Sequence, residues 1–258
     1  MDSVTGAAHW LAEKLSKSSL RSPSFGGCCL QGKVCLPPLR DPPATLRGLL
    51  TSDSQSSLLF RETIWKYNRA FAFTSVGVSE DRSVNRGNGP PVFRIFGELH
   101  HRSGALSAPD GHLPRYAQAY VHEPRAALDF RMRQNADLNS EILQSLQTML
   151  TGSHPYVQIY KHAHEILKDY NPANDAQVRL RLAPGYDSHC YNLPSADEVA
   201  VILPDNEAGS HPRDIVLRLR QGPLQRISEL HPSYAPLQYP LLFPHGEPGW
   251  YPEMTLSD

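Results

Sequence analysis

The sequence has no long apolar run and no excess of charge of either sign. No stretch approaches the roughly 18 apolar residues that span a bilayer, and Met1 to Thr5 lacks the basic start of a secretory signal. We therefore expect an intracellular, soluble protein with no membrane partner. The 25 Lys and Arg residues balance 26 Asp and Glu residues. Because nucleic-acid binders usually show a basic excess, any contact with DNA requires a local basic patch.

Two catalytic signatures are also missing from the chain. The phosphate-binding pattern G-x-x-x-x-G-K-[ST] does not occur, and Gly32-Lys33-Val34 does not supply it. No G-x-S-x-G nucleophile elbow is found, and no motif brings two carboxylates together. We therefore expect a chain that carries no complete active site of its own.

Cysteine is scarce, with four residues in the whole chain. Cys28, Cys29 and Cys35 fall within one short segment, and Cys190 lies far from them. In a reducing compartment this pattern argues against a disulfide framework and raises the question of zinc. The three thiolates and His9 supply four ligands of suitable chemistry, but the paired C-x₂₋₄-C spacing of a structural zinc site is absent. A bound zinc and a metal-free segment both remain open.

Proline is abundant, with 23 residues, which indicates many short elements and irregular connections. Apolar periodicity predicts helices and strands in mixed order and therefore an α+β fold, with an antiparallel sheet against packed helices. The expected helices cover 7–16, 44–51, 55–69, 139–150 (capped by Gly152) and 155–170. The expected strands cover 70–76, 92–99, 116–122, 177–182 and 215–220. A boundary near residue 40 separates a small cysteine-containing unit, 1–40, from the main domain, 41–258.

Two of the expected strands carry arginine at alternate positions. These residues are Arg179 and Arg181 in one strand, and Arg218 and Arg220 in the other. Alternation places each pair on one face of its strand. If the two strands are neighbours, four guanidinium groups line one face of the sheet and can bind phosphates. The alternative is the ordinary solvated side of a half-buried sheet.

A third candidate, His162-Ala163-His164, has the His-apolar-His pattern with which rolling-circle nucleases bind a divalent metal. That pattern works on a strand, where residues two apart share a face. The surrounding sequence has helical periodicity, and on a helix two residues turn by about 200°. The two imidazoles then point in opposite directions, so we expect no metal site here.

The stretch from Leu224 to Trp250 closely resembles the run HPSYxPLQYPLLFPHGExGW of Helitron helicase-like proteins. Further similarity covers nearly the whole chain. It includes the pattern CC-x-x-GKV-x-LP at Cys28 to Pro37 and the ranges 67–75, 92–102, 155–157, 191–194 and 213–216. The family more often has asparagine where this chain has His154. It also tends to have a C-x-x-C-G-A-x-H-W knuckle near its start, and this chain keeps Gly6-Ala7-Ala8-His9-Trp10 without a preceding cysteine.

The resemblance implies a piece of a much longer eukaryotic rolling-circle transposase, with the nuclease and the ATP-driven helicase downstream of this sequence. It further implies a nuclear location, DNA as a partner, and a degenerate zinc knuckle in the first 40 residues. The principal hypothesis is an accessory module that handles DNA and helps to position the nuclease. The alternative is an inert structural remnant that only packs against the missing domains, and a weaker one is a zinc-dependent binding unit.

The residues of the C-terminal stretch, 224–250, also support a structural interpretation that is independent of the resemblance. Pro232, Pro236, Pro240 and Pro244 recur at every fourth position, which opposes a regular helix through the segment. The aromatic and leucine residues between these prolines require burial. We therefore expect an extended, proline-rich strap pressed onto the body of the protein.

Overall fold

The computed structural model describes residues 12, 14–25, 40–80, 83, 94–169, 177–180, 200–203, 215–218 and 225–249. The chain divides into two compact units, one formed by Met1–Asp41 with Pro252–Asp258 and the other by Pro42–Tyr251. In the first unit, the described range 14–25 contains a turn in which the Leu15 amide donates to the Ser24 carbonyl at 2.8 Å. All helices and strands described below belong to the second unit.

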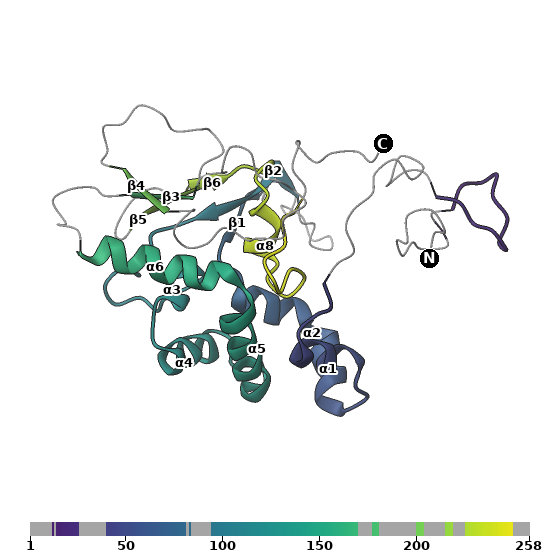
Figure 1. Ribbon diagram of the computed structural model, residues 1–258, viewed down its shortest axis with the longest axis horizontal. Helices are drawn as coiled ribbons and strands as arrows, with labels where there is room; N and C mark the ends of the chain where they lie inside the picture. Colours follow the sequence, from purple (N-terminus) through teal and green to yellow (C-terminus); the bar gives the residue numbers. More distant parts are fainter. Residues whose placement is uncertain are drawn as a thin grey trace. The chain divides into compact units, whose positions relative to one another are not determined.

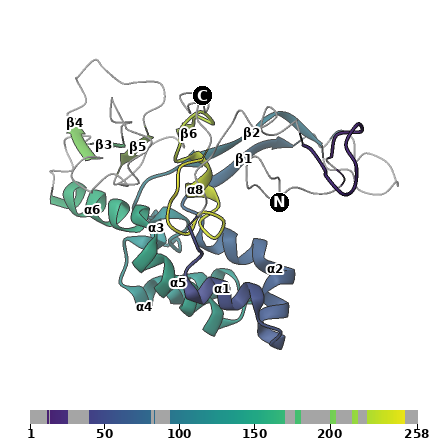
Figure 2. The same ribbon diagram turned by 45° about the vertical axis from the view of Figure 1, so that its right-hand side comes forward.

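Most helices of the second unit gather on one side of it and most of its strands on the other, whereas α8 lies beside strands (Figures 1 and 2). The described helices are α1 (Ala44–Thr51), α2 (Gln55–Phe71), α3 (Ala117–Tyr120), α4 (Pro124–Gln134), α5 (Ser140–Ser153), α6 (Pro155–Asp169) and α8 (Tyr234–Gln238). In the described ranges, each helix falls short of the length and apolar character of a bilayer span.

The helix starts follow from local sequence. Asn139 caps α5, because its side-chain oxygen accepts hydrogen bonds from the amides of Glu141 and Ile142 at 2.9 and 3.1 Å. Pro124 and Pro155 occupy the first positions of α4 and α6, where the missing N–H is not needed. The helices expected over 44–51 and 55–69 and from Pro155 are therefore confirmed as α1, α2 and α6.

The described strands form two three-stranded antiparallel sheets. The first contains β1 (Ser75–Glu80), β2 (Ile95–Ser103) and β6 (Gln225–Ile227) in the order β1-β2-β6. The second contains β4 (Ala200–Leu203), β3 (Gln177–Leu180) and β5 (Ile215–Arg218) in the order β4-β3-β5. Together with the helices, they confirm the α+β class.

Several expected elements are corrected. Residues 116–122 form no strand, because Tyr116 has a positive φ of 53° and the alanine-containing stretch after it is α3. The strand expected over 70–76 starts only at Ser75, because α2 continues to Phe71. Gly152 does not cap α5, which continues through it to Ser153 before the next proline. The helix expected over 7–16 falls mostly outside the described residues.

The C-terminal segment, 231–249, which we call the proline-rich segment, is not extended as expected. It forms the short helix α8 and then a series of turns, such as that closed by the Leu242 amide and the Tyr239 carbonyl at 2.9 Å. Pro236 fits because it lies in the first turn of α8, where its missing N–H costs no hydrogen bond. Gly246 has a φ of 68°, and a Cβ atom there would come within 2.8 Å of Pro155.

The segment does press onto the body of the protein, as expected. Its leucine Leu237 is fully buried, and the Leu237 carbonyl accepts from the Phe73 amide at 2.8 Å. Around Phe73 lies a cluster of buried rings: its centroid is 4.3 Å from that of Tyr120 and 5.3 Å from that of Tyr160. This cluster joins α2, α3, α6 and the proline-rich segment into one core.

Candidate nucleic-acid interface

The outer side of α2 presents an exposed aromatic ring close to two cations. Tyr67 and Phe71, four residues apart, face the core. Trp65 lies on the other side of the helix and keeps 58% of its surface exposed. Lys66 Nζ lies 5.6 Å and Arg69 Cζ 5.8 Å from the centroid of its ring, within the range of cation–π attraction. We call these three residues, Trp65, Lys66 and Arg69, the Trp65 face.

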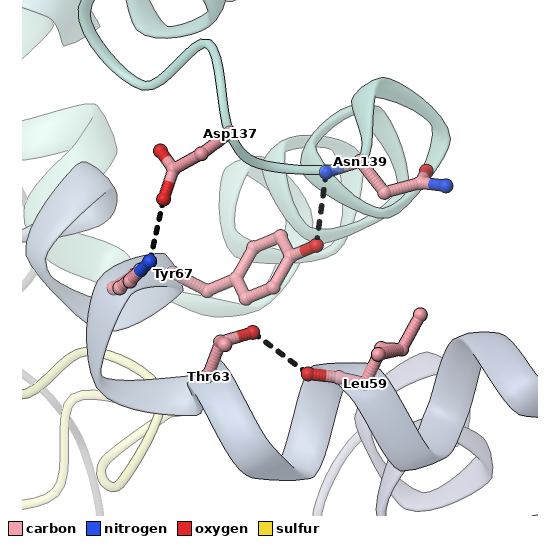
Figure 3. A network of polar contacts seen from close by, with 6 residues as sticks. Leu59, Thr63, Tyr67, Asp137 and Asn139 are labelled. Carbon is pink, nitrogen blue, oxygen red and sulfur yellow. Dashed lines mark hydrogen bonds and ion pairs between the residues drawn. The ribbon is translucent and has the colours of Figure 1, made fainter.

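A kink in α2 precedes this face. Thr63 departs from helical geometry, with φ −119° and ψ 17°, and its hydroxyl donates to the Leu59 carbonyl at 2.7 Å (Figure 3). Such bonds from a threonine to the preceding turn commonly bend helices. The direction of the last two turns of α2, which carry Trp65, is therefore set separately from that of its first turns.

Those last turns are tied to the loop before α5 by two contacts (Figure 3). The backbone amide of Asn139 donates to the Tyr67 hydroxyl at 3.1 Å, and Lys66 Nζ is 2.6 Å from an oxygen of Asp137. The hydrogen bond from Lys66 lowers the pKa of the Asp137 carboxyl, whereas burial raises the pKa of Tyr67. The ion pair is solvent-exposed and contributes little to stability, but it limits where the Lys66 ammonium lies.

Arg131 on α4 anchors the end of α2 from inside the protein. Its Nε donates to the Ala70 carbonyl at 3.2 Å, and a terminal nitrogen donates to Gln147 Oε1 at 2.8 Å. Its Cζ lies 4.9 Å from the ring centroid of Phe71 and 4.5 Å from that of Tyr120. Burial lowers the pKa of the Arg131 guanidinium and raises that of Tyr120 to about 12. This cation therefore serves packing and is closed to a ligand.

The strands that carry two of the predicted arginines are neighbours. Strands β3 and β5 pair antiparallel, with Arg179 opposite Val216 and Arg218 opposite Gln177. The two arginine positions are thus two residues apart along the paired strands. Arg181 and Arg220 lie outside the described residues.

The predicted metal ligands Cys28, Cys29, Cys35 and His9 all fall outside the described residues. His162 and His164 lie on α6, so the helical reading of that pair is confirmed. Within the part of the chain that the structure describes, no three histidine, cysteine, aspartate or glutamate side chains are grouped to hold a metal ion.

No protein-family model matches the chain, and no curated protein is significantly similar to it.

Sequence reasoning missed the Trp65 face. Trp65 counted as one more apolar residue of the helix expected over 55–69. The signal was nevertheless present, because Phe60, Ile64, Tyr67 and Phe71 recur at alternating spacings of four, three and four residues. That stripe defines the core side of the helix and leaves Trp65 outside it.

Proposed function

We propose that this chain is a non-catalytic nucleic-acid-binding module of a rolling-circle transposase of the Helitron type, acting in the nucleus. The observation that carries the proposal is the exposed Trp65 ring with Lys66 and Arg69 beside it. Proteins that bind single strands combine aromatic rings, on which bases stack, with cations that contact the phosphates. The adjacent strands with Arg179 and Arg218 add a second basic element.

Binding to single-stranded DNA is expected to depend on both parts of the Trp65 face. Trp65→Ala removes the stacking surface, which contributes about 1–3 kcal/mol per base, so affinity falls roughly 5- to 150-fold. Arg69→Ala removes one phosphate contact. The slope of log affinity against log salt concentration therefore becomes less negative by about 0.7. Fluorescence anisotropy with a labelled oligonucleotide of about 20 nucleotides, between about 50 and 200 mM salt, measures both quantities.

A matched control is Arg133→Ala. Arg133 is an exposed arginine on α4 that pairs with Asp129 at 3.0 Å and lies outside the Trp65 face. Its replacement is expected to leave affinity unchanged. The double variant Arg179→Gln/Arg218→Gln tests the second basic element separately. If it loses DNA affinity and Trp65→Ala does not, the interface lies on the β3–β5 sheet and the Trp65 face is rejected.

A second function, docking of the downstream nuclease and helicase domains, is favoured by another observation. Tyr239 and Leu242 in the proline-rich segment remain 42% and 71% exposed although the residues around them are packed. Exposed apolar side chains on a fixed surface are typical of interaction sites. If docking is the sole function, the isolated chain shows no DNA binding at low salt, and Leu242→Ser increases its solubility.

A further inference from the structure

The proline-rich segment is seated on the body of the protein through a seam of specific hydrogen bonds. They come from α2, from the residues before β1 and from the end of α5. The bonds join Asn68 Nδ2 to the Gln238 carbonyl at 2.9 Å, the Leu241 amide to Asn68 Oδ1 at 3.2 Å, Thr74 Oγ1 to Gln238 Oε1 at 2.7 Å and Ser153 Oγ to the Pro244 carbonyl at 2.9 Å. The Tyr156 hydroxyl is also bonded to Ser233 Oγ. Most of these contacts use neutral groups, so the seam as a whole has little inherent pH dependence.

His154, between α5 and α6, lies beneath this seam. It is 1% exposed, and its ring centroid lies 5.1 Å from that of Phe73 and 5.6 Å from that of Tyr156. Neither of its ring nitrogens has a hydrogen-bond partner of normal geometry among the described residues. Burial lowers the pKa of His154 to about 3; the Pro236 backbone opposes this shift and His245 adds to it. Both of the latter groups belong to the proline-rich segment.

His101 on β2 lies beneath another part of the same segment. It is 1% exposed, and its ring stacks on Tyr234 with centroids 3.8 Å apart and an angle of 14° between the planes. Tyr239 meets it edge-on at 6.0 Å, and its Nδ1 has no hydrogen-bond partner among the described residues. Burial lowers the pKa of His101; the Tyr234 backbone opposes this shift and the neighbouring His100 adds to it.

The charges near the two rings do not compensate for an added proton. The titratable groups beside His154 are His245 from the segment and Tyr156 of α6, and those beside His101 are His100, Tyr234 and Tyr239. Among the described residues, no carboxylate contributes to the pKa shift of either ring. A proton on either buried ring therefore has no described counter-charge.

We propose that the proline-rich segment is an acid-releasable latch, in which protonation of His154 and His101 opens the seam while the helices beneath it remain folded. The closed segment excludes water from both rings, so the closed state holds them neutral. Opening exposes the rings to water, where a histidine accepts a proton readily. Acid therefore favours the open state through mass action.

The direction and size of the pH effect on opening follow from the linkage between proton binding and the opening equilibrium. Because the closed-state pKa of His154 is about 3, below the value of about 6.5 for a solvated histidine, closure is fully favoured above about pH 6.5 and weakens as pH falls towards the lower value. Between about pH 7.5 and about pH 5, titration of this one residue raises the opening equilibrium constant about 30-fold. His101 shifts in the same direction and adds to this factor.

Amide hydrogen exchange on the full chain tests the latch. With intrinsic exchange rates corrected for pH, the amides of Phe73 and Leu241 are expected to lose protection on acidification while those in the middle of α5 keep it. His154→Phe keeps a ring beside Phe73 but cannot be protonated. In this variant the acid-induced rise in the opening equilibrium constant is expected to be smaller by a factor of about 30. His101→Phe removes a further share. If His154→Phe folds poorly, His154→Asn serves as a smaller residue that is neutral at every pH.

His112→Asn is the matched control, because His112 lies exposed in the loop before α3 and bonds only locally to the Asp110 carbonyl at 3.1 Å. It is expected to leave the pH profile unchanged. Simultaneous loss of protection at Phe73, Leu241 and α5 at every pH would show a single global unfolding and overturn the latch. An unchanged pH profile in both His154 variants would overturn it as well.

Discussion

Phe73→Ala is expected to lower the free energy of unfolding by about 4 kcal/mol, the usual cost of removing a buried phenyl ring. The Phe73 ring is 1% exposed and contacts Tyr120, Tyr160 and His154 at centroid distances of 4.3, 5.3 and 5.1 Å. Its removal leaves a cavity where three helical elements and the proline-rich segment meet. For a domain of this size the melting temperature falls by roughly 8–16 °C, as measured by differential scanning calorimetry.

Two variants provide the comparison for Phe73→Ala. Phe73→Leu refills much of the cavity and is expected to cost less than half as much. Trp65→Ala removes a still larger ring, but that ring is 58% exposed, so we expect a loss below about 1 kcal/mol. Equal losses for Phe73→Ala and Trp65→Ala would contradict the assignment of one ring to the core and the other to an interface.

Arg131→Ala is expected to cost about 3–4 kcal/mol, because it opens a cavity beside Phe71 and Tyr120 and leaves buried hydrogen-bond acceptors without donors. Gln147 Oε1 and the Ala70 carbonyl lose donors at 2.8 and 3.2 Å, and the rings of Phe71 and Tyr120 lose a stacked cation. The guanidinium has only neutral hydrogen-bond acceptors among the described residues. The loss is measured by urea unfolding monitored by circular dichroism.

Arg131→Met distinguishes packing from hydrogen bonding in the same experiment. Methionine fills a similar volume, needs no counter-charge and contacts aromatic rings favourably. We expect it to recover at least half of the loss seen with alanine. A methionine variant as unstable as the alanine variant would show that the hydrogen bonds to Gln147 and Ala70, rather than the packing, carry the stabilisation.

The elements that could be predicted from sequence are those with local signals. The helix α5 has an apolar stripe and the capping residue Asn139, and Pro155 marks the start of α6. The pairing of β2 with β6 has no such signal, because His101 lies opposite Ile227, more than a hundred residues away in the chain. The strand predicted over residues 116–122 is wrong, because so short a segment carries little periodicity; Ala117, Ala119 and Tyr120 are instead buried on the short helix α3.

The candidate interface, too, could be predicted from the sequence only in part. Alternation identified Arg179 and Arg218 as residues of two strands, and the structure shows those strands to be neighbours. The exposure of Trp65 depends on which side of α2 faces the core, and the kink at Thr63 also sets the direction of its last turns. Sequence periodicity contained the first part of that information. It did not contain the second, since the kink depends on one threonine hydroxyl bonding to the preceding turn.

The tryptophan itself offers the most direct test of the proposed function. The chain has three tryptophans, so replacing Trp10 and Trp250 by phenylalanine leaves Trp65 as the sole indole emitter. On titration with single-stranded DNA, we expect saturable quenching of its fluorescence, because a base stacks on the ring, and reversal of the quenching by salt. DNA binding without any change in Trp65 emission, or no binding at low salt, would contradict the proposed function at this face.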